Sequence, residues 1–447
     1  MLRRLDPARM LVLSFALVIA AGSWALRQPW AAVEGKQLRW IEAAFTATSA
    51  VCVTGLVVRP PADHTVAGQV VIVTLIQVGG IGIITFGLFF SLLLGRRLSV
   101  FGRSVMMSSL AQGPWEDFWP LLRTVMQATL AIEGMGAVLL AVGWWGEKGW
   151  LAVPWGAFHA VSAFCNAGFG LDAANLIPWR GNATVVLTVG MLIIFGGLGF
   201  LPMTDILERW RHGRRRPLTL HTRVALAGTA GLLVAGWIGF AVLEAGTTLA
   251  GLPLKEQVLA VWFQSITPRT AGFNTLDFGL MTPATLVFTM VLMFIGASPG
   301  STGGGVKTTT AGVLVAVLIA KLRSRRQVSL FGRRLGEGSV SAAVVVLVLA
   351  LLTVVGGMVL VTSFEHGARG GPQAAGPFLW EAFDVVSAFG TVGLSTGITP
   401  RLTDGSWLTL ILTMFAGRVG PLTLGLALAG RRPRVEPQLA EEDLMVG

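Results

Sequence analysis

The sequence predicts an all-α polytopic membrane protein, in which four parallel helix–pore-helix–helix repeats surround a central pore with eight transmembrane helices and four re-entrant pore helices. Two observations predict this class. Of the 447 residues, 53% are hydrophobic and only 13% are charged, which leaves more apolar surface than a soluble core can bury. Four short segments of similar sequence also recur at intervals of roughly a hundred residues, and such self-similarity indicates a chain made from one repeated unit.

Each of the four segments begins with an aromatic residue, continues with small or apolar helix formers, and closes on an extended tripeptide that ends in glycine. The closing residues are Gly55, Gly168, Gly272 and Gly393. We therefore divide the chain into four repeats with one of these glycines in each: residues 1–100, 101–215, 216–335 and 336–447, the last of which includes a C-terminal tail.

Apolar runs flank every segment. A helix needs about 20 predominantly apolar residues to cross the hydrocarbon layer of a membrane. The runs that we expect to cross are Met10–Leu26, Val66–Leu94, Leu121–Val142, Thr184–Leu207, Val224–Leu243, Ala284–Ile295 continuing as Ala311–Leu322, Ala342–Val361 and Leu408–Gly430. Shorter apolar pieces precede the glycines and suit re-entrant half-helices: Trp40–Val51, Pro154–Cys165, Glu256–Ile266 and Leu379–Phe389.

The formal net charge of +11 is concentrated on one side of this topology. Most Lys and Arg residues fall in the two termini and in the loops between repeats. Because cytoplasmic loops of membrane proteins carry the excess of Lys and Arg, both termini and these loops are predicted to be cytoplasmic. Contact of these loops with the inner leaflet of the membrane accounts for the excess of basic over acidic residues, so no nucleic-acid partner is expected.

The sequence predicts neither an enzyme nor an organic cofactor. The two cysteines occupy similar places before the first two glycines, where a small buried residue suffices, and the five histidines are scattered. These residues form no metal-ligand cluster and no pair of nucleophile and base.

The segments around the four glycines predict a selectivity filter for a monovalent cation. Non-helical backbone at membrane depth persists only where protein or a watery cavity shields its polar groups. Carbonyls aimed at a shared axis can replace the water shell of an alkali cation, and glycine reaches the positive φ that this arrangement needs. Each half-helix would also direct its negative C-terminal end toward the axis. The predicted filter residues are Val53, Thr54, Gly55, Asn166, Ala167, Gly168, Thr270, Ala271, Gly272, Thr391, Val392 and Gly393.

A broken helix in the third repeat, at residues 296–310, predicts a mobile intramembrane gate. Five glycines and one proline within ten residues cannot form a straight helix. A loop at this depth must be shielded from lipid, and in a pore the shielded place lies beneath the filter. A static kink is the alternative. The predicted gate residues are Gly296, Ala297, Ser298, Pro299, Gly300, Ser301, Thr302, Gly303, Gly304, Gly305 and Lys307.

Several strings resemble the Trk/Ktr/HKT superfamily of potassium transporters, and most of all its KtrB branch, the membrane subunits of Ktr uptake systems. They are SAVCVTGL, FCNAGFGL, FGGLGF, LHTR, GASPGSTGGGVKT and GRVGPLTL, and the resemblance covers essentially the whole chain. It implies K⁺ as the transported ion, because all four repeats keep glycine, whereas some HKT members place serine in the first. It also implies Na⁺ as an activator, at a site that the sequence does not locate.

The resemblance further implies roles and partners. Arg418, an ionisable residue within the last span, would project into the pore below the filter and slow the passage of cations; a buried ion pair with Glu133 or Asp205 is the alternative. Members of the KtrB branch are homodimers of the bacterial inner (plasma) membrane, and they bind a cytosolic KtrA-like ring of nucleotide-binding regulatory subunits. The basic stretches Arg209–Arg223 and Arg323–Arg334 would dock this ring.

The predicted function is potassium-selective uptake across the plasma membrane through a carbonyl-lined filter, gated by the glycine-rich loop and controlled by the cytosolic partner. A coupled secondary transporter of cations or solutes is the alternative. Such folds typically contain inverted repeats, whereas each repeat predicted here starts and ends on the cytoplasmic side.

Overall fold

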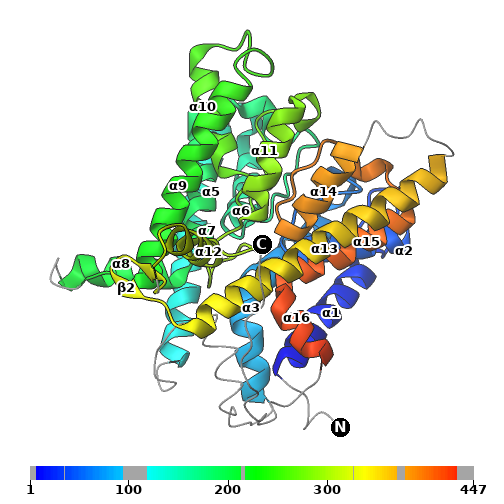
Figure 1. Ribbon diagram of the computed structural model, residues 1–447. Helices are drawn as coiled ribbons and strands as arrows, with labels where there is room; N and C mark the ends of the chain where they lie inside the picture. The colour runs from blue at the N-terminus through cyan, green and yellow to red at the C-terminus, as the bar shows by residue number, and fades with distance from the viewer. Residues whose placement is uncertain are drawn as a thin grey trace.

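The computed structural model describes residues 7–34, 36–93, 118–212, 217–325, 327–369 and 378–429 (Figure 1). This part of the chain is mostly helical, as predicted. Its only strands are β1 (Ser329–Leu330) and β2 (Arg333–Arg334), which pair antiparallel in a short hairpin that the sequence did not suggest.

The helices follow one order four times: a long helix, a short helix that ends a few residues before one of the four glycines, and a third helix. We call each such set a triplet. The long helices are α1 (Pro7–Leu26), α5 (Phe118–Lys148), α9 (Leu220–Leu243) and α13 (Glu337–Arg369). The short helices are α2 (Trp40–Val51), α6 (Ala152–Phe164), α10 (Leu254–Ile266) and α14 (Phe378–Gly390), and the third helices are α3 (Val66–Leu93), α7 (Ala183–Leu198), α11 (Pro283–Phe294) and α15 (Asp404–Val419).

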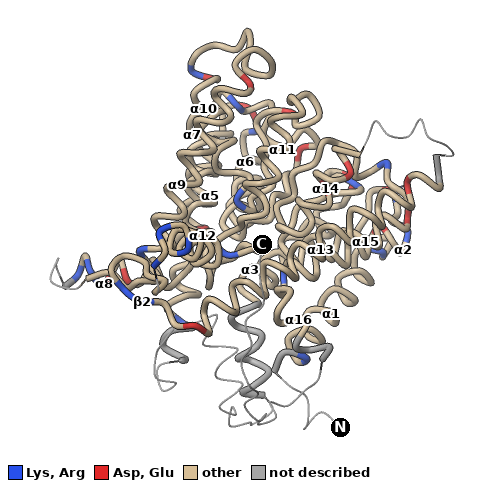
Figure 2. Tube along the Cα trace, in the orientation of Figure 1, with Lys and Arg blue, Asp and Glu red and all other residues tan. Residues whose placement is uncertain are grey.

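Four helical stretches of the described residues are long and apolar enough to cross a membrane: Arg9–Leu26, Arg123–Phe164, Leu220–Leu243 and Glu337–Gly367. The second of these stretches combines two helices, α5 and α6, and is not one straight helix. The chain turns back between α5 and α6, as their close packing shows: a methyl group on Gly156 of α6 would lie 2.5 Å from the carbonyl oxygen of Ala137 on α5. Charged residues lie mainly near helix ends in Figure 2, which leaves the middles of the helices apolar.

The four triplets close into a ring. Within the described residues α3 contacts α6, α7 contacts α10, α11 contacts α14, and α15 contacts α2. Each third helix therefore packs on the short helix of the next triplet, and the last triplet returns to the first. The buried hydrophobic clusters follow the same order, since one joins α6, α7 and α10 and another joins α2, α14 and α15.

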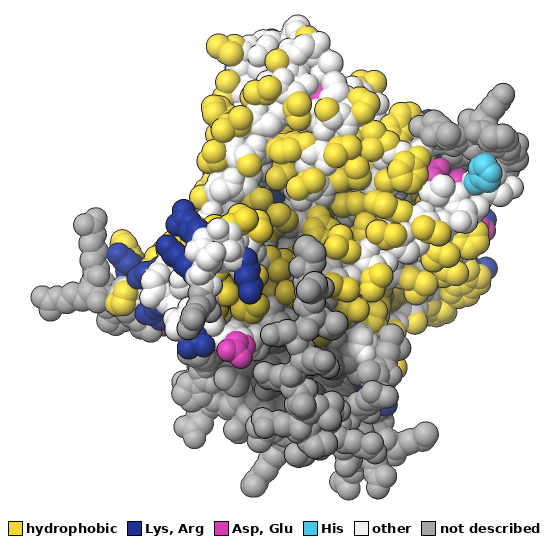
Figure 3. All heavy atoms as spheres, viewed as in Figure 1, with side chains coloured by type: hydrophobic (Ala, Val, Ile, Leu, Met, Phe, Trp, Pro, Cys, Tyr) yellow, Lys and Arg dark blue, Asp and Glu magenta, His cyan; other side chains and the backbone are white. Residues whose placement is uncertain are grey.

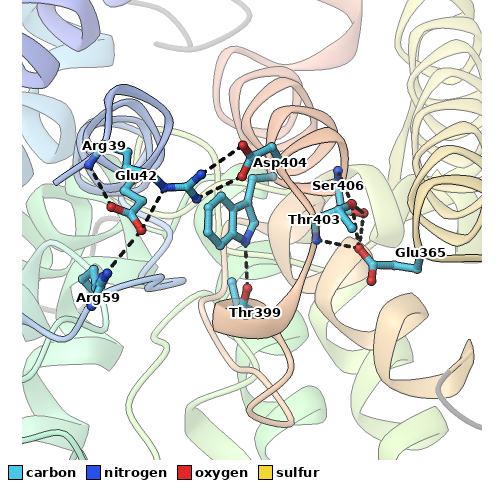
Figure 4. A network of polar contacts seen from close by, with 9 residues as sticks. Arg39, Glu42, Arg59, Glu365, Thr399, Thr403, Asp404 and Ser406 are labelled. Carbon is cyan, nitrogen blue, oxygen red and sulfur yellow. Dashed lines mark hydrogen bonds and ion pairs between the residues drawn. The ribbon is translucent and has the colours of Figure 1, made fainter. Parts of the chain in front are cut away.

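Polar contacts also hold the junction between the last and the first triplet (Figure 4). The guanidinium of Arg39, directly before α2, donates to both carboxylate oxygens of Asp404, the first residue of α15, at 3.1 and 3.0 Å. This hydrogen bond raises the pKa of Arg39. The two side chains are 55% and 60% exposed, so the pair stabilises the fold by less than about 1 kcal/mol.

Two buried carboxylates tie the ends of long helices to the starts of third helices. Glu365 of α13 accepts hydrogen bonds from the backbone N–H and hydroxyl of Thr403 and from the hydroxyl of Ser406, at 2.7, 2.9 and 2.7 Å (Figure 4). Glu244, which follows α9, accepts from the backbone N–H of Thr282 at 3.1 Å. Thr403 and Thr282 are the N-caps of α15 and α11, so the same device recurs in the last two triplets.

The predicted span Thr184–Leu207 is wrong as a single helix. Gly199 has a φ of 86° and divides it into α7 and α8 (Phe200–His212), which are bent by 96° relative to each other. A glycine with positive φ commonly ends a helix. The hydropathy of the run continues across Gly199, and for this reason the sequence predicted one helix where the structure has two.

The predicted span Leu408–Gly430 is also divided. Helix α15 ends at Val419, Gly420 has a φ of 90°, and Pro421 begins α16 (Pro421–Ala429). Proline suits the first turn of a helix because that turn needs no N–H donor. In the third triplet, the irregular segment 295–307 separates α11 from α12 (Thr308–Leu322).

Some predictions fall outside the described residues. These are the repeat boundaries at 100/101 and 215/216 and the placement of both chain ends in the cytoplasm. The boundary at 335/336 lies between β2 and α13.

We expect Glu365→Ala to destabilise the protein more than Arg39→Ala. Loss of the Glu365 carboxylate leaves the half-buried donors of Thr403 and the buried hydroxyl of Ser406 without their acceptor, which costs about 1–3 kcal/mol. Loss of the exposed Arg39 guanidinium costs less than about 1 kcal/mol. Thermal unfolding of both purified variants in one detergent measures the difference, and equal midpoints would contradict it.

Candidate functional site

The glycines that close the four segments meet at one place in the structure. We call them the ring glycines: Gly55, Gly168, Gly272 and Gly393. A methyl group on Gly168 would lie 2.7 Å from the Cα of Gly272, and one on Gly393 would lie 2.8 Å from the Cα of Gly55. One on Gly55 would lie 3.2 Å from the Cα of Gly168. No side chain fits at any of these positions, although the glycines lie more than a hundred residues apart in the sequence.

The carbonyl that precedes each ring glycine faces the ring glycine of a neighbouring triplet. The facing pairs run around the ring in the same order as the helix contacts, so each triplet contributes one carbonyl and one ring glycine to the ring. The pairs are Thr54 with Gly393, Val392 with Gly272, Ala271 with Gly168, and Ala167 with Gly55.

The backbone around the ring is strained in the same way in all four triplets. The ring glycines have φ between 70° and 98°, and the residue two positions before each of them also has a positive φ. These preceding residues are Val53 (55°), Asn166 (61°), Thr270 (66°) and Thr391 (48°). Three of the four are β-branched, for which a positive φ costs on the order of 1–3 kcal/mol each. Such strain persists only where the surrounding structure imposes it.

Hydroxyl groups at the ends of the short helices impose this geometry. The hydroxyls of Ser49 and Ser387 accept the N–H of Gly55 and of Gly393, each at 3.0 Å. The hydroxyl of Ser162 donates to the carbonyl of Phe169 at 2.8 Å. These residues were not among the predicted site residues. Their signal in the sequence is the dipeptide Ser-Ala, which stands six residues before the ring glycine in three of the four segments.

The third helices approach the ends of the short helices through glycine. A side chain on Gly79 would meet the carbonyl of Val51, one on Gly196 would meet that of Phe164, and one on Gly417 would meet that of Phe389. The carbonyl ends of the short helices, which carry partial negative charge, therefore lie packed beside the ring.

The predicted gate residues form the loop at 296–305, which lies against two of the four strained segments. A side chain on Gly303 would meet the hydroxyl of Thr270, and one on Gly304 would lie 2.9 Å from Cγ2 of Thr391. The loop is anchored at its base, where the N–H of Gly296 donates to the carbonyl of Val306 at 2.8 Å.

Helix α7 and its neighbours hold this loop in place. The N–H groups of Ser298 and Thr302 donate to the carbonyls of Gly197 and Gly196, at 3.1 and 3.2 Å. The hydroxyl of Thr302 donates to the carbonyl of Phe164 at 3.1 Å. Each such bond contributes about 1 kcal/mol or less, so the loop is held by several weak bonds.

Arg418 is 3% exposed and bridges the loop to the first triplet. Its guanidinium donates to the carbonyl of Thr302 and, at 2.5 Å, to the carbonyl of Gly79. Both of these bonds go to backbone carbonyls, whereas Glu133 and Asp205, the carboxylates of the alternative ion pair, accept from Gln77 at 3.0 Å and from Thr219 at 2.9 Å.

Lys307 also contacts the loop, since its ammonium donates to the carbonyl of Gly303 at 2.5 Å. Together with Arg418, it places two cationic side chains on backbone carbonyls of one short segment. The structure thus brings all the predicted site residues into one region and adds the serines described above.

The chain is similar to known cation transport proteins. A family profile described as TrkH, cation transport protein, matches residues 17–434. The potassium/sodium uptake protein NtpJ of Enterococcus hirae is 38% identical over 451 residues, covering 100% of this chain and 98% of that protein. The Ktr system potassium uptake protein B of Bacillus subtilis is 38% identical over 430 residues, covering 95% of this chain and 94% of that protein.

A solved structure is also similar. The potassium transporter TrkH from Vibrio parahaemolyticus superposes with a TM-score of 0.71 over 95% of this chain and 84% of that one, at 20% identity. At this identity the likeness shows a shared fold.

We expect Ser49→Ala and Ser387→Ala each to destabilise the protein by about 1–3 kcal/mol, because each leaves the N–H of a ring glycine without its acceptor. Ser363→Ala is the matched control. Its hydroxyl lies on an exposed helix face, donates to the carbonyl of Val359, and is expected to contribute within about 0.5 kcal/mol. Thermal unfolding in detergent compares the three variants. Shifts no larger than that of Ser363→Ala would contradict the assignment.

Proposed function

The chain belongs to the TrkH family of cation transport proteins, and from this premise we propose that it takes up K⁺ across the plasma membrane through a filter formed by the ring glycines and the residues before them. Members of this family are multi-pass membrane transporters, and the chain is not an enzyme. The observation that carries the proposal is the meeting of the four ring glycines, each against the carbonyl that precedes the ring glycine of a neighbouring triplet.

The chemistry of the ring suits a dehydrated monovalent cation. Backbone carbonyls replace water as ligands without adding a formal charge, so K⁺ binds and still leaves. The strained residues and the serines hold the oxygens in position before the ion arrives. The carbonyl ends of four short helices add a negative potential from every side.

The same proposal assigns eight crossings to the chain, one for each long helix and one for each third helix. Three of the four third helices are short because they bend or break: α7 at Gly199, α11 before the loop, and α15 at Gly420. Their breaks lie among protein, where freed backbone groups find partners.

The loop at 296–305 is proposed as the gate. It lies against Thr270 and Thr391, two of the residues that lead into the ring, and Arg418 fastens it to α3. A guanidinium at this place opposes the passage of a cation, and release of the loop would remove the obstacle and free the guanidinium of Arg418 from the carbonyl of Thr302.

The partners follow from the family. We propose a homodimer that binds a cytosolic ring of nucleotide-binding subunits through the basic segment 323–334, and stimulation by Na⁺. The support is the names of the relatives, a potassium/sodium uptake protein and a Ktr system protein B, together with the exposed arginines of this segment.

Uptake of ⁸⁶Rb⁺ into K⁺-loaded vesicles that contain the purified chain tests the filter. Gly393→Ala is expected to lower the flux at least tenfold, because a methyl group there meets the carbonyl of Thr54. Gly397→Ala is the matched control: its φ of 86° is close to the 89° of Gly393, so the backbone penalty is alike, but its surroundings are open. Equal effects would contradict the filter, and uptake of an organic solute would favour the coupled transporter.

Deletion of residues 299–303 tests the gate. The variant loses the contacts beneath Thr270 and the carbonyl that Arg418 binds, so we expect a Rb⁺ flux several-fold above that of the unmodified chain. The ratio of Rb⁺ to Na⁺ flux should stay unchanged, because the ring is untouched, and this ratio is the internal control. An unchanged flux would indicate a static kink.

A further inference from the structure

Helix α8 lies across the direction of the bundle and is not needed to build the ring. It follows α7 after a bend of 96° and projects sideways from the other helices in Figure 1. If α7 crosses the membrane, a helix bent by this angle lies along the membrane surface. The neighbouring basic segments place that surface on the cytoplasmic side.

The exposed face of α8 is apolar and aromatic. Ile206, Leu207 and Trp210 are 40%, 44% and 82% exposed. At 100° per residue these three positions fall within an arc of about 100° on one side of the helix. The opposite side faces the protein, since Asp205 is buried and accepts from the backbone N–H of Thr219 before α9.

Two arginines border this apolar face. Arg209 and Arg211 stand on either side of Trp210 in the sequence, and at 100° per residue they project to the two flanks of the face. Figure 3 shows Lys and Arg gathered at the edge of the molecule that carries α8 and β2. An apolar stripe with a tryptophan and flanking arginines is the pattern of helices that lie in the headgroup region of a membrane.

The start of α8 touches the proposed gate. The N–H of Phe200 donates to the carbonyl of Gly300 at 3.1 Å, and a side chain on Gly199 would lie 2.9 Å from the carbonyl of Pro299. The end of α7 holds the same loop through Gly196 and Gly197. Because backbone hydrogen bonds connect the start of α8 and the end of α7 to the loop, a movement of α8 acts directly on the loop.

We propose that α8 is a site for anionic phospholipid headgroups of the inner leaflet, and that their binding steadies the bend at Gly199 and so regulates the 296–305 loop. The regulatory part rests on the proposed gate; the lipid site does not. The occupant is a lipid because the apolar face and both arginines would meet the membrane surface, where each arginine strengthens binding to anionic lipid about fivefold.

Lipid binding is tested by quenching. The variant Leu207→Cys carries a bimane label, which Cys52 and Cys165 should not take up because both are buried. The labelled full chain is placed in vesicles that contain either brominated phosphatidylglycerol or brominated phosphatidylcholine. Stronger quenching by the anionic lipid is expected, and Arg209→Gln with Arg211→Gln should abolish the preference. Arg333→Gln with Arg334→Gln on the hairpin is the matched control and should keep it.

The regulatory part is tested by Rb⁺ flux in vesicles with and without phosphatidylglycerol. The flux of the unmodified chain should depend on this lipid, and that of the Arg209→Gln, Arg211→Gln variant should not. Absent quenching, or equal quenching by both lipids, would overturn the lipid site. Selective quenching with a flux that ignores the lipid would overturn the regulation. Selective quenching without Rb⁺ flux in any vesicle would support the site and contradict the transport function instead.

Discussion

Four stretches of non-helical backbone share one small space at the centre of an apolar bundle, and the rest of the structure depends on satisfying them there. Carbonyl oxygens that lie close together repel one another, and polar backbone groups inside an apolar bundle need partners within the protein. The ring geometry excludes every side chain at Gly55, Gly168, Gly272 and Gly393, so main-chain atoms of the four triplets meet there directly. The scaffold must therefore supply both the space and the restraint.

The scaffold supplies the restraint in layers. Serine hydroxyls fix the N–H groups of Gly55 and Gly393, and third-helix glycines let helices such as α15 approach the ends of the short helices. Farther out, Glu365 and Glu244 fasten the starts of third helices to the ends of long helices. Val53, Thr270 and Thr391, whose backbone has a positive φ, would relax without these layers. Their strain of about 1–3 kcal/mol each is larger than the contribution of a single hydrogen bond.

Sequence patterns predict the parts of this architecture that depend on local composition. The half-helix Trp40–Val51 matches α2 at both ends, and the glycine motif identifies the segments that meet at the ring. The breaks at Gly199 and Gly420 were missed because hydropathy continues across them, and only the φ of each glycine ends the helix. The partners of Arg418 could not be predicted, because they are the backbone carbonyls of Gly79 and Thr302. Every residue has a backbone carbonyl, so the sequence does not indicate which ones a side chain will bind.

The closed arrangement of helices has a consequence for the order of the chain. Helix α16 contacts α1, so the first and last described helices are neighbours, and α15 meets α2 just as each earlier third helix meets the short helix after it. The chain thus has no covalent link across this junction, which packing and the hydrogen bonds between Arg39 and Asp404 hold together. Cutting the polypeptide at another connection and joining the old ends by a linker would keep every such contact, so a circular permutant should assemble to the same architecture.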